Sequence, residues 1–189
     1  MKALSGLTPI LKGGVRILRP CEYELLRKGA KKLQNQVRLD TLLLTGLRYV
    51  EAQRLYENPI WFDGKFIHLP EYAQKKAKRK QRERWVRLNP QGQQILPFFF
   101  KGPPLPSWKA WTECLKRWAA RAGLDPTGLG PKTTRKTWES WLVTCYPKRI
   151  MEVFLSQGHT ELTSLRHYLN LPFTEVDKLE MKRWTSGWI

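Results

Sequence analysis

Apolar residues recur at helical spacing over most of the 189-residue chain. This pattern predicts two helices near the start, in CEYELLRKGAKKLQ and VRLDTLLLTG, and the second should end at Gly46. It predicts a short helix in YVEAQRLYEN and a longer one in PSWKAWTECLKRWAARAG. The longer helix carries a stripe of large side chains three or four residues apart, which is typical of a face that packs in a core. The stripe consists of Trp108, Trp111, Leu115 and Trp118.

In the middle of the chain the spacing of apolar residues changes from helical to alternating, as in a β-strand. IWFDGKFIHLP sets Asp63 and Gly64 between two short β-prone runs, which predicts a hairpin. RERWVRLNP predicts a third strand, with Trp85 and Val86 on opposite faces. Four short helices should follow in KTTRKTWESWLVTCYP, KRIMEVFLSQG, ELTSLRHYLN and TEVDKLEMKRW. We therefore expect one compact domain over residues 1–189 that is mainly α with a small three-stranded antiparallel β-sheet.

The net charge of the chain limits the classes of molecule that are expected to bind it. Thirty-four Lys and Arg face 16 Asp and Glu, for a net charge of +18, so a polyanion is expected and nucleic acid is the leading candidate. Aromatic residues make up 12% of the chain, which excludes a disordered basic tail. Three cysteines without a C-x-x-C pair indicate neither a disulfide scaffold nor a zinc ribbon. No stretch of 18 apolar residues occurs, so we expect a soluble, cytoplasmic protein without a membrane partner.

The segment QKKAKRKQRERWVR concentrates this charge, because it holds eight basic residues against one acidic residue. So many like charges repel one another unless a polyanion neutralises them, so phosphate contact is favoured over a merely solvated loop. The residues we expect to contact DNA here are Lys75, Lys76, Arg79, Arg82 and Arg84.

Four separated pieces of the sequence hold residue types suited to phosphate chemistry. Arg48 follows Thr-Gly-Leu at the end of a predicted helix. Lys132 and Arg135 lie three residues apart in PKTTR, where the start of a helix would point both cations to one side and favour an anion. His159 follows a glycine in SQGH, and Tyr168 comes nine residues later.

In this order the pieces resemble the catalytic domain of the tyrosine recombinases, the phage-integrase family. TGLRYVEAQRL is similar to the first signature of that family, KTTR to its H-x-x-R signature, and SQGHTELTSLRHY to the last, including the tyrosine nine residues after the histidine. The resemblance extends from about Cys21 to the C-terminal helix. It implies the tyrosine recombinase catalytic fold, an α+β fold, and site-specific cleavage and rejoining of DNA through a covalent 3′-phosphotyrosine.

The resemblance also implies a role for each residue. Tyr168 would be the nucleophile, and a hairpin lysine, Lys80 or else Lys78, would protonate the leaving 5′-oxygen. Donors to the phosphate would offset the charge that builds on its oxygens in the transition state. Those donors would be Arg48, Lys132, Arg135 and His159. The mechanism needs no cofactor and no metal, and three histidines without clustered carboxylates support a metal site poorly.

The sequence departs from the family pattern in two places. Lys132 stands where H-x-x-R has histidine, a replacement that also occurs in recombinases of archaeal viruses and in type IB topoisomerases. The resemblance also starts close to the first residue, so we expect a single catalytic domain here and not the N-terminal helical core-binding domain with which the family usually clamps the other face of the duplex.

The expected partner is double-stranded DNA, in the cytoplasm of a prokaryotic host of a virus or other mobile element. Recombination requires a tetramer on two DNA sites, and TEVDKLEMKRW is a candidate for docking to a neighbouring subunit, with packing in its own chain as the alternative. Two other functions remain open. One is type IB topoisomerase-like relaxation of DNA, and the other is a non-catalytic DNA-binding protein that retains the fold.

Overall fold

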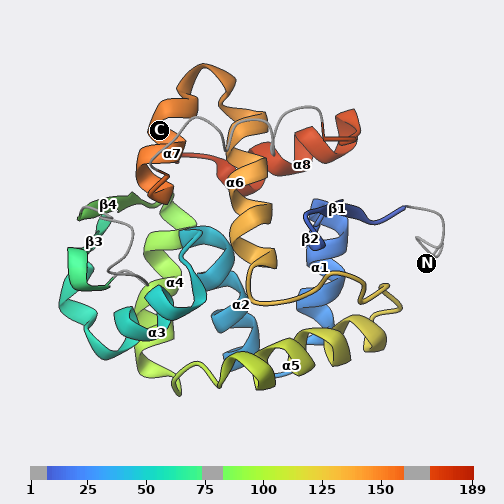
Figure 1. The fold of residues 1–189 in the computed structure, drawn as a ribbon, viewed down its shortest axis with the longest axis horizontal. Coiled ribbons are helices and arrows are strands. Elements are labelled where there is room, and N and C mark those ends of the chain that lie inside the picture. Colours follow the sequence, from blue (N-terminus) through green and yellow to red (C-terminus); the bar gives the residue numbers. More distant parts are fainter. Residues whose placement is uncertain (1–7, 74–82, 160–170) are drawn as a thin grey trace.

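The computed structural model describes residues 8–73, 83–159 and 171–189, and this part of the chain is mainly helical (Figure 1). The helices are α1 (Pro20–Gly29), α2 (Leu33–Thr45), α3 (Tyr49–Glu57), α4 (Pro90–Lys101), α5 (Trp108–Arg121), α6 (Thr133–Cys145), α7 (Ile150–Gln157) and α8 (Glu175–Thr185). The strands are β1 (Ile10–Lys12), β2 (Val15–Ile17), β3 (Phe66–Leu69) and β4 (Arg84–Arg87). Short 3-10 turns lie at η1 (Pro59–Trp61), η2 (Glu71–Ala73) and η3 (Pro147–Arg149).

Helix α6 is the centre of the fold. It stands in the middle of the molecule and packs against α2, α7, α8 and β2 (Figure 1). Buried residues lie on all sides of it, with Trp138, Trp141 and Leu142 fully buried. A helix that is buried all round belongs to a core rather than to a surface. Polar side chains placed on α6 are therefore held inside the protein, where they need partners.

The prediction of one three-stranded sheet is wrong for the described residues, which form two two-stranded antiparallel sheets, β1–β2 and β3–β4. The expected first strand, IWF, forms the 3-10 turn η1 instead, and only Phe62 makes a single bridge to Ile67. Pro59 favours the start of that turn. Asp63 Oδ1 then accepts from the main-chain N–H groups of Lys65, at 2.8 Å, and Phe66, at 2.6 Å. The chain therefore turns before a full strand can form.

The β1–β2 hairpin was not predicted, although the sequence holds its signal. Gly13 and Gly14 both have positive φ, 55° and 70°, as the central residues of a two-residue hairpin turn require. Sheet β3–β4 agrees with the expected alternation, because Val86 is buried and Trp85 is exposed.

The helices agree better with the prediction. Those expected in the later segments are confirmed as α5, α6, α7 and α8, and ELTSLRHYLN, residues 161–170, lies entirely outside the described part. The first expected helix divides at Gly29, which lies against Trp118 of α5. A Cβ on Gly29 would lie 2.9 Å from the carbonyl carbon of Trp118, so only glycine permits this approach.

Helix α8 packs on α6 and α1 of its own chain. Met181 is fully buried, and Arg19 Nη1 donates to Asp177 Oδ2 at 2.6 Å in a buried ion pair. Docking of this helix to another subunit stays a prediction. None of the described helices is long and apolar enough to cross a membrane.

Candidate functional site

The ends of two helices meet at the guanidinium group of Arg135. Helix α2 ends at Gly46 and α7 ends at Gly158, both in the left-handed conformation, with φ of 59° and 70°. Arg135, on α6, donates from Nη1 to the carbonyl of Gly46 at 2.8 Å and from Nη2 to the carbonyl of Gln157. These bonds satisfy carbonyl groups that a helix end leaves without intrahelical partners. They bring Arg48 and His159, which follow the two glycines closely, to one place.

Both glycines are also needed for space. A Cβ on Gly46 would lie 2.8 Å from Trp138 Cδ1 and 2.8 Å from Gln157 Nε2. A Cβ on Gly158 would lie 2.8 Å from Arg84 Cδ. Any other residue would combine strained backbone with a steric clash. The Thr-Gly-Leu-Arg and Gln-Gly-His segments therefore hold their glycines for a structural reason.

Arg48 and Arg84 share one buried carboxylate. Arg48 is the N-cap of α3, and Glu51 accepts from its main-chain N–H at 2.8 Å and from its Nη1 at 2.6 Å. Arg84, on β4, donates to both carboxylate oxygens of Glu51, at 3.1 Å and 2.8 Å. Arg48 Nη2 also lies 3.4 Å from the carbonyl of Gly158, and Arg84 Nε donates to the carbonyl of Ser156 at 3.1 Å. Glu51 thus holds two guanidinium groups beside the end of α7.

The electrostatic balance at Glu51 favours its ionised form. Burial alone would raise the pKa of this carboxyl group, but the charge and hydrogen bonds of Arg84, together with Arg135 and Arg48, lower the pKa to about 2. The Glu51 side chain is completely buried, whereas that of Arg48 is 25% exposed. Arg48 is therefore the cation of this group with the most access to solvent.

A second carboxylate, that of Glu139, also interacts with Arg135. Glu139 follows Arg135 by four residues on α6, and its side chain is completely buried. His159 Nε2 pairs with Glu139 Oε1. The His159 ring packs against the edge of Phe154 with ring centroids 5.4 Å apart, and its main-chain N–H donates to the carbonyl of Phe154 at 3.0 Å. Burial lowers the pKa of Arg135 to about 10, with Arg48 and Arg84 acting in the same direction and Glu139 opposing it.

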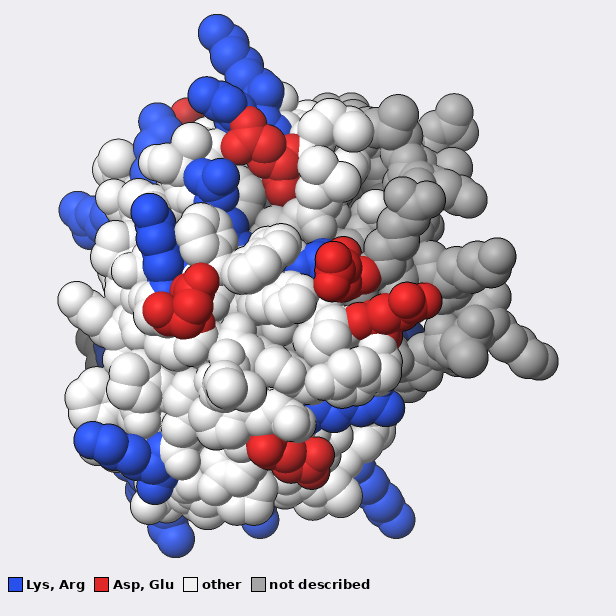
Figure 2. All heavy atoms as spheres, turned by 90° about the vertical axis from the view of Figure 1, so that its left-hand side faces the viewer, with Lys and Arg blue, Asp and Glu red and all other residues white. Residues whose placement is uncertain are grey.

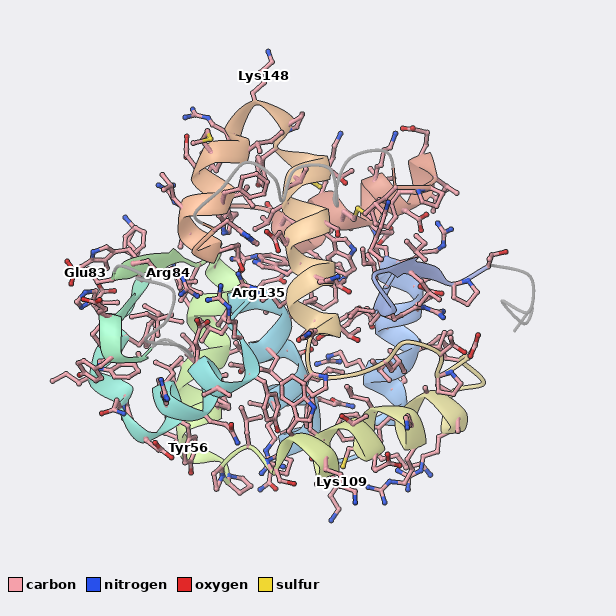
Figure 3. All side chains as sticks on the ribbon, in the orientation of Figure 1. Tyr56, Glu83, Arg84, Lys109, Arg135 and Lys148 are labelled. Carbon is pink, nitrogen blue, oxygen red and sulfur yellow. The ribbon has the colours of Figure 1, made fainter. Side chains whose placement is uncertain are left out.

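We call this group the arginine cluster, and it consists of Arg48, Arg84, Arg135, Glu51, Glu139 and His159. Figure 3 shows the labelled Arg84 and Arg135 extending toward one another from β4 and α6, whereas Glu83 points outward. Three guanidinium groups face two carboxylates, so positive charge is in excess even when His159 is neutral. An anion such as phosphate would be favoured at this place, and guanidinium groups suit it because they stay charged and present a planar fork.

The structure brings together three of the residues that the sequence singled out, namely Arg48, Arg135 and His159. Arg84, expected to contact DNA from the basic segment, is buried and joins them through Glu51. Lys132 is the exposed N-cap of α6, one turn before Arg135. The two cations were expected to point to one side, but the guanidinium of Arg135 turns into the protein to reach the carbonyls of two helix ends.

The remaining predicted residues lie outside the described part of the chain. They are Lys75, Lys76, Lys78, Arg79, Lys80, Arg82 and Tyr168. Their placement at the site stays a prediction.

Sequence reasoning missed the two glutamates and Gln157. Glu51 could have been found, because it lies at the third position of a predicted helix, where a carboxylate caps the N-terminus. Glu139 could have been found only as an i,i+4 partner of Arg135, and the chain holds many such pairs.

The surface around β3 and β4 carries charges of both signs. Figure 2 shows this face with Lys, Arg, Asp and Glu scattered among other residues, without a single basic patch over the described residues there. On the described part of this face, the gathered positive charge is therefore the one inside the arginine cluster. Among the described residues no group of three or more His, Cys, Asp or Glu side chains could hold a metal ion.

A comparison with protein-family models and a search of curated proteins found no match to this sequence.

The buried Glu51 predicts an acid-dependent stability. Its folded pKa of about 2 lies below the ordinary value of 4.5, so ionised Glu51 stabilises the fold fully above about pH 4.5, and this contribution is lost as pH falls through about 2. At pH 7, Glu51→Gln should lower the free energy of unfolding by about 3 kcal/mol, because it leaves buried guanidinium groups without a counter-charge.

Urea unfolding of both proteins at a series of pH values measures this effect. The difference between wild type and Glu51→Gln should shrink between about pH 4.5 and about pH 2. Glu113→Gln is the control, because Glu113 is exposed and pairs only with Lys116 at 3.3 Å, so its effect should stay below about 0.5 kcal/mol. A difference that is the same at all pH values would contradict the assignment.

Proposed function

We propose that this protein cleaves and rejoins DNA through a covalent 3′-phosphotyrosine intermediate, as tyrosine recombinases do, with Tyr168 as the nucleophile. The observation that carries the proposal is the convergence of Arg48, Arg135 and His159 at the ends of α2 and α7. These residues come from three signatures that are far apart in the sequence. Residues without a common function would not be expected to lie together at one place in the fold.

The cluster suits the demands of phosphoryl transfer. When the Tyr168 oxygen attacks phosphorus, a P–O bond to tyrosine forms and the bond to the 5′-oxygen breaks, while negative charge builds on the non-bridging oxygens. Guanidinium groups that are already fixed in place stabilise that charge without reorganising. Glu51 and the helix-end carbonyls hold the three arginines in this way.

Proton transfer completes the step. The phenol of tyrosine has an ordinary pKa near 10, so it must lose its proton during attack, with help from neighbouring cations or a base such as His159. The leaving 5′-oxygen needs a proton, for which Lys80, or else Lys78, is our candidate from the family resemblance. The phosphotyrosine keeps the energy of the original bond, so the strands can be rejoined without ATP. Binding of duplex DNA and assembly of a tetramer belong to the same proposal.

One observation favours the alternative of a non-catalytic DNA-binding protein. Both terminal nitrogens of Arg135 already donate to main-chain carbonyls, which is what a purely structural arginine would do. In that case the basic segment would bind phosphates and the cluster would only tie helix ends together.

Trapping of the covalent adduct separates these functions. Wild-type protein is incubated with a pool of nicked duplexes of randomised sequence, in which a cleaved strand diffuses away and cannot be rejoined. We expect a protein–DNA adduct that survives denaturing electrophoresis, and mass spectrometry should locate the DNA on Tyr168. No adduct over a range of sequences would favour the DNA-binding protein. Relaxation of many unrelated plasmids by the monomer would favour topoisomerase-like activity.

A further inference from the structure

We propose that Glu139 is a positioning residue that holds the imidazole of His159 in the orientation needed for DNA cleavage. At the same time, its negative charge lowers the affinity of the arginine cluster for a phosphate. This inference rests on the proposed function, because it assigns Glu139 a role in the same site.

The position of Glu139 leaves it little freedom. It lies on the central helix α6, on the turn that follows Arg135, and its side chain has no exposure to solvent. A buried carboxylate is costly unless charged or hydrogen-bonding groups face it. The Nε2 atom of His159 pairs with Oε1 of Glu139, and the positive charges of Arg135 and Lys136 also act on this carboxylate. Glu139 therefore acts on both His159 and Arg135, two residues that the proposed reaction uses.

The contact fixes the orientation of the His159 ring. The imidazole packs against the ring of Phe154 on one side and pairs with Glu139 through Nε2, and the main-chain N–H of His159 is fixed by the carbonyl of Phe154. A carboxylate against Nε2 keeps a hydrogen on that nitrogen, because a lone pair there would face the lone pairs of the oxygen. Nδ1 is then the ring nitrogen left to accept a proton from a substrate group, or to donate to a phosphate when the ring is protonated. Glu139 thereby selects which ring nitrogen serves the substrate.

The same carboxylate reduces the positive charge of the cluster. Glu51 is engaged with Arg48 and Arg84, so Glu139 is the second negative charge near Arg135. Removal of this charge would increase the attraction of the cluster for phosphate. It would also release the His159 ring from its fixed orientation. Glu139 is therefore expected to act on binding and on reaction in opposite directions.

Glu139→Gln tests this, because glutamine has nearly the same shape without the charge. Cleavage of nicked duplex by the adduct assay should slow on the order of 10²-fold, since a misplaced catalytic group loses about this much. Affinity for the same duplex, measured in a Tyr168→Phe background so that no cleavage occurs, should rise about fivefold from the added positive charge. A purely structural glutamate would lower both quantities when replaced. Loss of affinity together with rate would overturn the proposal.

Nitrogen NMR tests the orientation without any substrate. In ¹⁵N-labelled wild type, the His159 ring spectrum should show hydrogen on Nε2, and Glu139→Gln should change this spectrum. Glu83→Gln is the matched control, because Glu83 pairs with a different histidine, His68, at 3.3 Å on the surface. It should leave the His159 signals unchanged. Identical His159 signals in wild type and Glu139→Gln would overturn the proposal.

Unfolding measurements cover the case in which a variant is unstable. Thermal unfolding of Glu139→Gln, His159→Gln and the double variant forms a double-mutant cycle. If the two side chains interact, the second substitution should lower the melting temperature less when the first is already present. Additive effects would reject the interaction. Absence of any adduct with wild-type protein would instead reject the proposed function, so the two failures are distinguishable.

Discussion

Replacement of Tyr168 by phenylalanine is expected to abolish the covalent protein–DNA adduct while leaving affinity for duplex DNA nearly unchanged. The substitution removes only the phenolic oxygen, which is the atom that would bond to phosphorus, and keeps the aromatic ring. Because DNA affinity comes mainly from contacts with many phosphates, the loss of one hydroxyl should hardly affect it. The adduct is measured on nicked duplexes by denaturing electrophoresis, and the affinity by gel shift at a stated salt concentration.

A matched control distinguishes the nucleophile from other tyrosines. Tyr72 lies on η2 and is 74% exposed, away from the described contacts of the arginine cluster. Tyr72→Phe should form the adduct at the wild-type rate. An adduct that persists in Tyr168→Phe would mean that another residue attacks the DNA, and an affinity that collapses would mean that Tyr168 serves the fold.

Arg48→Ala should slow cleavage by 10²-fold or more with little loss of stability. Removal of one preorganised donor from a charged transition state costs on the order of 3 kcal/mol. Arg48 is the partly exposed member of the cluster, and Glu51 keeps its bidentate contact with Arg84 when Arg48 is lost. Single-turnover cleavage and urea unfolding measure the two effects. Arg149→Ala is the control, since Arg149 is exposed and pairs only with Glu152 on α7.

Arg135→Ala gives an informative contrast. It should also slow cleavage, but it should lower the free energy of unfolding as well, because the carbonyls of Gly46 and Gln157 lose their donors. If Arg48→Ala changes only the affinity for DNA and not the cleavage rate of bound DNA, Arg48 is an ordinary phosphate contact. The catalytic role of the cluster would then be rejected.

The chemistry of the site could be predicted from the sequence only in part. Arg48, Arg135 and His159 were found because the order and spacing of the signatures carry them. Glu51 and Glu139 were not found, because a glutamate on a helix is usually solvated and nothing local marks it as buried. Arg84 was assigned to the surface because it stands next to a basic segment, yet its position in β4 points it inward with Val86.

The predicted three-stranded sheet also shows that local sequence preference alone does not determine the structure. Both halves of IWFDGKFIHLP have β-prone residues, so local preference favours a hairpin. Pro59 and the side chain of Asp63 turn the chain first, and only β3 finds a partner strand, β4, across a connection of 14 residues. A strand is stable only when another strand pairs with it, and that partner lies elsewhere in the chain.

The sequence by itself determined most of the helices, the excess of positive charge and the residue types available for phosphate chemistry. These follow from local properties, since apolar spacing and helix-ending glycines act within a few residues. Only the tertiary structure decided which charges neutralise one another. Arg84 meets Glu51 from 33 residues away, and His159 meets Glu139 across the junction of α6 and α7. The physical reason is the cost of burial. A charged group that is removed from water is stable only beside an opposite charge or a hydrogen-bonding group, and the packing of the helices determines which such group lies next to it.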